Sequence, residues 1–130
     1  MSQLASITSL ALLLGLVMPQ LQGAQLAAHR AQAQETLEEL GRGSLAFAAA
    51  HGGQPPAALG DLRGFVAPRL ADLLEDGAAG GYLYAIGPDP ADAGAQGALV
   101  TAAPAVAGVT GDAVCRIDAG LAISCDPVRP

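Results

Sequence analysis

Residues 7–18 have the sequence Ile-Thr-Ser-Leu-Ala-Leu-Leu-Leu-Gly-Leu-Val-Met, and no charged residue precedes Arg30. An uncharged, strongly apolar stretch of this kind near an N-terminus enters a membrane, is removed as a signal peptide, or is buried by neighbouring copies of the chain. Each of these fates places the protein at or beyond a membrane. The stretch therefore excludes most classes of cytoplasmic enzyme.

With its uncharged flanks, the apolar stretch is long enough to span a membrane. A bilayer crossing needs about 20 apolar residues, and the flanks extend the stretch to residues 4–21. Leu, Ala and Met favour a helix here, and Pro19 is expected to bend that helix. The residues expected to lie in the membrane or in an assembly contact are Leu10, Leu12, Leu13, Leu14, Leu16, Val17, Met18 and Pro19.

A cleaved signal peptide is the alternative to a retained helix. Pro19 would then mark the end of the apolar core of that signal. However, Ser2 and Gln3 are neutral, so the basic region with which signal peptides usually begin is missing. This omission weighs against plain secretion.

Residues 24–50 continue as an amphipathic helix, because small and apolar side chains recur at helical spacing. Gly41 and Gly43 are each expected to weaken this helix by roughly 1 kcal/mol. The sequence His51-Gly52-Gly53 ends the helix, and Pro55-Pro56 prevents its resumption. The expected apolar stripe consists of Leu26, Ala33, Leu37, Leu40, Ser44 and Phe47.

The rest of the chain predicts a short helix followed by strands. Residues 68–75 begin with a proline and favour a short helix. Gly and Asp-Gly turn signals then separate runs with strand-like composition. The predicted strands cover residues 82–86, 98–102, 113–117 and 121–124, with a hairpin around Asp118-Ala119-Gly120.

These elements predict an α+β fold, in which a long N-terminal helix packs on a small antiparallel sheet. Residues 1–23 form the hydrophobic half of the helix and residues 24–53 its amphipathic half. Residues 54–130 form a linker and sheet domain, which makes one globular unit with residues 24–53.

Composition limits the partners of the chain. It has a net charge of −6, and its six basic residues are scattered, whereas phosphate binding needs clustered Lys and Arg. No nucleic-acid partner is therefore evident. Only 3% of the residues are aromatic. Because Ala and Leu supply most of the apolar area, we expect a thin core that the long helix and neighbouring subunits complete.

Cys115 and Cys125 are the two cysteines, and their spacing fits no CxxC redox or zinc pattern. In an exported protein, such a pair flanking a hairpin can form one disulfide. A tight turn would place Cys115 diagonal to Cys125, so a bond would need a bulge or a short tail beyond the strand. The sequence leaves the bonded and free states open.

Little in the sequence points to catalysis or to a bound metal. No serine lies in a GxSxG-type elbow, and His29 and His51 have no neighbouring Cys or Asp, so we expect no enzyme activity and two solvated histidines. Calcium is the only cofactor with any support, through Asp112, Asp118 and Asp126 near the hairpin loops. Their spacing matches no defined calcium loop, which favours turn-forming aspartates and no cofactor.

Taken in order, several short motifs resemble those of type IV pilins and the pseudopilins of type II secretion. They are Met18-Pro19-Gln20 inside the helix, Gly-Gly-Tyr-Leu-Tyr at 80–84, and Ala-Leu-Val-Thr-Ala-Ala-Pro at 98–104. The run from Pro104 to Gly111 and the sequence Cys-Arg-Ile-Asp-Ala-Gly at 115–120 complete the resemblance, which covers essentially the whole chain.

The resemblance implies a structural filament subunit. Such a subunit would cross the bacterial inner membrane once, with its globular domain in the periplasm or on a surface filament. The implied partners are further copies of the chain, other pilin-like subunits, the assembly machinery and membrane lipid.

One departure from the family concerns processing. Pilin precursors carry a basic leader that ends in Gly, and a Glu follows a few residues into the apolar segment. Here no basic residue and no Gly precede residues 7–18, and those residues contain no Glu. The position of Pro19 would place the mature start just upstream of Met1. Either translation starts further upstream, or this is a degenerate member that is not processed normally. The competing function is a small exported periplasmic binding or accessory domain with a cleaved signal peptide.

Overall fold

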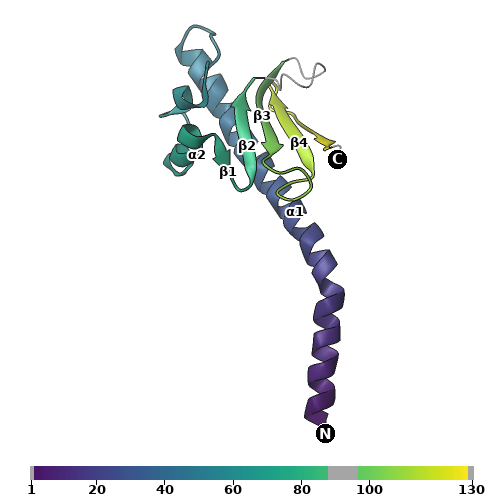
Figure 1. Ribbon diagram of the computed structural model, residues 1–130. Helices are drawn as coiled ribbons and strands as arrows, with labels where there is room; N and C mark the ends of the chain where they lie inside the picture. The colour runs from purple at the N-terminus through teal and green to yellow at the C-terminus, as the bar shows by residue number, and fades with distance from the viewer. Residues whose placement is uncertain (1, 88–96, 129–130) are drawn as a thin grey trace.

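The computed structural model describes the backbone of residues 2–87 and 97–128, and the side chains of residues 24–87 and 97–128. One long helix, α1 (Ser2–Ala50), carries a five-stranded sheet on its second half. The first half of α1 projects beyond the sheet (Figure 1). This arrangement confirms the predicted α+β class, with a helix packed on an antiparallel sheet.

The sheet is a simple meander, in which each strand pairs antiparallel with the next one along the chain. The predicted strand at residues 82–86 matches β2, and the one at 98–102 is two residues longer than expected. The strands are β1 (Ala78–Ala79), β2 (Tyr82–Ile86), β3 (Ala98–Pro104), β4 (Ala113–Asp118) and β5 (Ile123–Pro127).

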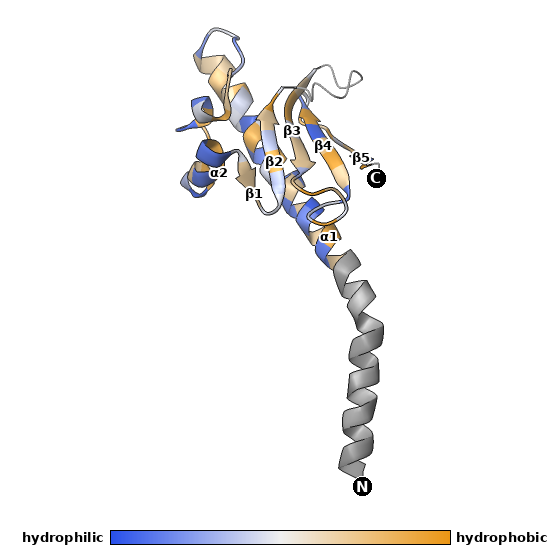
Figure 2. Ribbon diagram, in the orientation of Figure 1, coloured by the Kyte–Doolittle hydropathy of each residue, from blue (hydrophilic) through white to orange (hydrophobic). Residues whose placement is uncertain are grey.

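The core lies between α1 and the sheet. Leu37 and Leu40 are both 0% exposed, and Ala33 and Ser44 of the predicted stripe are also buried. Because side chains alternate across a strand, every second residue of β2 and of β4 faces α1. Hydrophilic and hydrophobic residues alternate along α1 where it passes the sheet (Figure 2).

Phe47, the last residue of the predicted apolar stripe, is not buried between α1 and the sheet as the rest of that stripe predicts. It is only partly buried and packs against the core from its margin. Its ring stacks on His51 at 3.9 Å and meets the edge of Phe65 at 5.5 Å between centroids. The last turn of α1 therefore contacts the linker rather than the strands.

Gly41 and Gly43 allow other elements to approach α1 closely. A Cβ at Gly41 would lie 2.8 Å from Ile117 Cδ1, and one at Gly43 would lie 2.4 Å from Val66 Cγ1. The expectation that these glycines merely weaken the helix is therefore incomplete, because larger residues would push β4 and the linker away.

The linker closes the open side of the core with three short helices. They are η1 (Leu59–Leu62), η2 (Pro68–Leu70) and α2 (Ala71–Asp76), and the last two together match the helix predicted at residues 68–75. These helices contribute four buried leucines to the core, which are Leu62, Leu70, Leu73 and Leu74. Gly77, with φ of 74°, ends α2 in the left-handed conformation.

The C-terminal hairpin differs from its prediction, because its turn is longer than expected. The second strand begins at Ile123 instead of residue 121. The Asp118 carboxylate accepts hydrogen bonds from the backbone N–H groups of Gly120 and Ala122, and Leu121 has a positive φ of 61°. These contacts stabilise the wider turn and shift the register of the hairpin.

That register places Cys115 directly opposite Cys125 and not diagonal to it. The two residues form a disulfide, with their Cα atoms 4.1 Å apart. No bulge or tail beyond the strand is needed, so this part of the prediction was wrong. Gln34 Nε2 donates to Cys125 Sγ at 3.3 Å, which ties the disulfide to α1.

Candidate functional site

The loop between β3 and β4, residues 105–112, lies beside α1 at the end of the sheet from which the helix projects (Figure 1). His29 Nδ1 donates to the Thr110 carbonyl oxygen at 3.1 Å, and the Arg30 guanidinium pairs with the Asp112 carboxylate at 3.3 Å. These contacts anchor the loop to the helix. We call this end of the domain, comprising residues 24–30 and 105–112, the exit pole.

The loop has its own internal closure. Thr110 Oγ1 accepts a hydrogen bond from the Val106 backbone N–H, and the N–H of Gly108 donates to the Gly111 carbonyl oxygen. Gly108 has φ of 78°, a conformation that side chains rarely adopt. The loop therefore has a defined shape although it lies at the surface.

The exit pole is exposed and, apart from the Arg30–Asp112 pair, carries no charged side chain. Among the described residues, Val109 (68% exposed) and Val106 (53% exposed) are the most exposed large hydrophobic side chains. Residues 97–111 contain no charged residue, and neither do residues 24–29 of the helix when histidine is neutral. An open groove of about 420 Å³ separates the two segments, and it is lined by Gln25, Leu26, His29, Gly108 and Val109.

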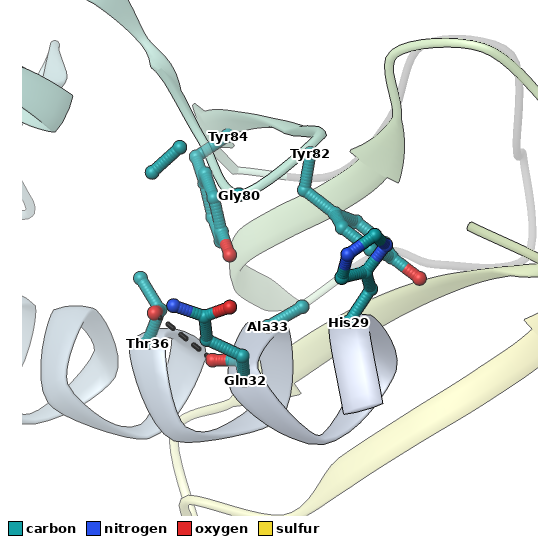
Figure 3. A pocket seen from close by; sticks show the side chains of 8 residues that line it. His29, Gln32, Ala33, Thr36, Gly80, Tyr82 and Tyr84 are labelled. Carbon is teal, nitrogen blue, oxygen red and sulfur yellow. Dashed lines mark hydrogen bonds between the residues drawn. The ribbon is translucent and has the colours of Figure 1, made fainter. Parts of the chain in front are cut away.

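A second, much smaller space lies between α1 and β2 (Figure 3). Its volume of about 10 Å³ corresponds to about one water molecule. Thr36 Oγ1 donates to the Gln32 carbonyl oxygen at 3.0 Å. The space is too small for a substrate. Its lining residues are His29, Gln32, Ala33, Thr36, Ala79, Gly80, Tyr82 and Tyr84.

The two tyrosines beside this space differ in how their hydroxyl groups are satisfied. Burial raises the pKa of both above 10.0, and the nearby Asp112 carboxylate also raises the pKa of Tyr82. Interaction with the Thr36 side chain partly opposes the rise in the pKa of Tyr84. The Tyr82 hydroxyl is buried and has no hydrogen-bond partner among the described residues.

Neither histidine pairs with a nucleophile among the described residues. His29 is partly buried through its bond to Thr110, so it is not the solvated residue that the sequence predicts. His51 is exposed, as predicted, and its Nδ1 donates to the Phe47 carbonyl oxygen at 2.8 Å. Both imidazoles therefore use a ring nitrogen to bind backbone.

The three aspartates considered for calcium do not gather into one cluster in the described part of the chain. Asp112 directly precedes β4, Asp118 is the last residue of β4, and Asp126 of β5 pairs with Arg116. Asp112 pairs with Arg30, and Asp118 caps its own turn, as turn-forming aspartates do. The part of the chain described by the structure contains no cluster of acidic, histidine or cysteine side chains suited to a metal ion.

The predicted membrane and assembly residues, Leu10, Leu12, Leu13, Leu14, Leu16, Val17, Met18 and Pro19, lie outside the residues whose side chains the structure describes. Among residues 24–87 and 97–128, whose side chains the structure describes, no helix is both long enough and apolar enough to cross a membrane.

Val106 and Val109 were not singled out from the sequence. The sequence feature that could have identified them is the uncharged run 97–111, in which these two valines follow the end of a predicted strand among alanines and glycines. The position of this run beside residues 24–29 is a tertiary contact, and no local pattern reports it.

This chain matches no family model, no curated protein and no solved structure.

Proposed function

We propose that this protein is a structural subunit of a type IV pilus-like or type II secretion pseudopilus-like filament. Residues 4–21 hold the monomer in the inner membrane, and in the filament the same apolar surface is buried against neighbouring copies. The domain carried by residues 24–130 then lies on the periplasmic or outer side of that helical core.

The observation that carries the proposal is the continuity of α1. The helix runs from Ser2 to Ala50 without a break, and its second half supplies the fully buried Leu37 and Leu40 of the domain core. An uncharged apolar segment thus leaves the domain as an extension of its central helix. Ala and Gly within that segment let helices approach closely, which supports packing between copies.

The first test is the N-terminus of the protein isolated from the organism that makes it. We expect a mature chain that retains residues 4–21 and is recovered from membranes. A mature terminus near Gln25 or Gln34 would contradict the filament proposal, and would favour an exported periplasmic binding or accessory domain.

The second test asks whether copies meet through the apolar segment. Leu14→Cys in the full-length chain, oxidised in native membranes, should give disulfide-linked dimers. The matched control is Leu83→Cys on β2, where the side chain is 50% exposed and lies outside the proposed contact. Because the native cysteines are bonded to each other, they do not compete. Equal crosslinking of the two variants would contradict assembly through the helix.

A further inference from the structure

The exit pole combines three properties that the rest of the described domain does not share. It has the two most exposed large hydrophobic side chains, Val106 and Val109. It carries no net charge, because Arg30 and Asp112 neutralise each other at its margin. It is also the end from which α1 projects toward residues 4–21 (Figure 1).

We propose that the exit pole is a lipid-docking surface, on which residues 105–110 rest in the headgroup layer of the bilayer. The inference rests on the proposed function, because it takes residues 4–21 as the membrane span. It adds a second point of membrane contact, which fixes the tilt and rotation of the domain before assembly.

The rise of the helix places the loop at the right height. Residues 25–29 line the groove beside Val109 and follow the end of the span at residue 21. A rise of about 1.5 Å per residue puts them about 6–12 Å above the hydrocarbon core. The headgroup layer is about 5–8 Å thick on each side. The near end of the groove, at Gln25 and Leu26, therefore lies within this layer, and its far end, at His29, lies at or just beyond the outer edge.

The chemistry of the loop suits lipid better than a protein partner. Tight protein interfaces concentrate Tyr, Trp and Arg at their centres, whereas residues 105–111 are Ala, Val, Gly and Thr. Small apolar residues without charge gain from leaving water for the headgroup layer and suffer no repulsion from anionic lipid. The net charge of −6 is carried elsewhere on the chain, so an anionic membrane surface disfavours other orientations.

The absence of tryptophan from the chain allows a direct test by single-tryptophan fluorescence. Val109→Trp reports on the pole, Leu45→Trp on the part of α1 far from it, and Leu13→Trp on the span. Leu45 is 36% exposed, so it is a surface position outside the exit pole. Each full-length variant is reconstituted into dioleoylphosphatidylcholine vesicles that contain either a headgroup-nitroxide lipid or an acyl-brominated lipid.

We expect Val109→Trp emission to shift to shorter wavelength and to be quenched several-fold more by the headgroup nitroxide than Leu45→Trp emission. Val106→Trp should behave like Val109→Trp, which guards against a local misfold at one position. Leu13→Trp should be quenched mainly by the acyl-chain bromines.

Three other outcomes would overturn the inference. If Leu13→Trp is quenched but Val109→Trp and Val106→Trp are not, the docking surface is wrong while the proposed function stands. If Val109→Trp shifts to shorter wavelength without quenching by either lipid, a second copy covers the pole instead. If Leu13→Trp itself escapes quenching, the membrane span of the proposed function fails, and the docking surface fails with it.

Discussion

Tyr82 and Tyr84 lie two residues apart on β2 and face α1, and among the described residues the buried Tyr82 hydroxyl has no hydrogen-bond partner. Tyr84→Phe removes a hydroxyl that interacts with the Thr36 side chain and should lower the free energy of unfolding by up to about 1 kcal/mol. Tyr82→Phe removes a buried hydroxyl that has no partner in the described part of the chain, and it should leave stability unchanged or slightly raised. Urea unfolding of both variants measures the difference, and an equal loss from each would show that the Tyr82 hydroxyl is satisfied.

The same tyrosines predict a loss of stability in alkali. Burial raises the pKa of both in the folded state above 10.0, the value expected in the unfolded chain. As the pH rises, the unfolded state therefore loses these protons before the folded state does. The two tyrosines cost no stability below about pH 10, and the free energy of unfolding falls as the pH rises through their pKa values in the folded state. The double variant with Phe at both positions should unfold with a weaker pH dependence in this range. If the double variant lost stability in alkali as steeply as the unaltered protein, the two tyrosines would not be the cause of that loss.

Gly43 is predicted to be intolerant of even one methyl group. Its Cβ would meet Val66 Cγ1 at 2.4 Å and the Phe65 carbonyl oxygen at 3.3 Å, so Gly43→Ala should cost about 1–3 kcal/mol in spite of its better helix propensity. Gly60→Ala is the control, because nothing lies within 4 Å of its Cβ position. Thermal unfolding compares the two, and a stabilised Gly43→Ala would show that the linker yields easily.

At the scale of elements, the buried stripe of α1 is the main contact between helix and sheet. Leu40→Asp places an unpaired carboxylate at a position that is 0% exposed and should destabilise the domain by more than about 3 kcal/mol. Leu45→Asp, on the exposed side of the same helix, should have little effect. A soluble chain that starts at Ala24 suits the measurement. Equal melting temperatures for the two variants would exclude the helix-on-sheet packing.

The sequence predicted those elements whose signal is local. The stripe of α1 and the strand at residues 82–86 follow from periodicity, and the helix end at Ala50 follows from the glycines and prolines after it. The hairpin register could not be derived in this way, because the side chain of Asp118 sets the length of the turn. One residue type in a turn thus decided whether Cys115 faces Cys125.

The candidate site was less accessible from the sequence than the fold. Thr110 and Asp112 are separated by about eighty residues from His29 and Arg30, which they contact. Such pairs depend on where the sheet is placed along α1, and that placement depends on close approaches such as Gly41 to Ile117. Periodicity identifies the face of a helix but not the loop that comes to lie beside it.

At the scale of the whole molecule, charge and apolar surface are separated along the axis of α1. Residues before Arg30 and the run 97–111 are uncharged, and they meet at the exit pole. The ion pairs Arg42–Glu38, Arg69–Glu39 and Arg116–Asp126 lie on the remainder of the domain. An axis with one neutral end suits a protein whose helix enters lipid while its domain stays in water.

This separation predicts that self-association resides in the N-terminal half of α1. A chain that starts at Ala24 has few aromatic side chains for a tight interface and should stay monomeric at micromolar concentration in analytical ultracentrifugation. The full-length chain should partition into membranes, where Leu13→Lys should weaken insertion by about 3 kcal/mol. Leu83→Lys, at an exposed position on β2, is the control and should insert normally. Tight oligomers of the truncated chain would place the interface on the domain, because the apolar segment would then be dispensable for assembly.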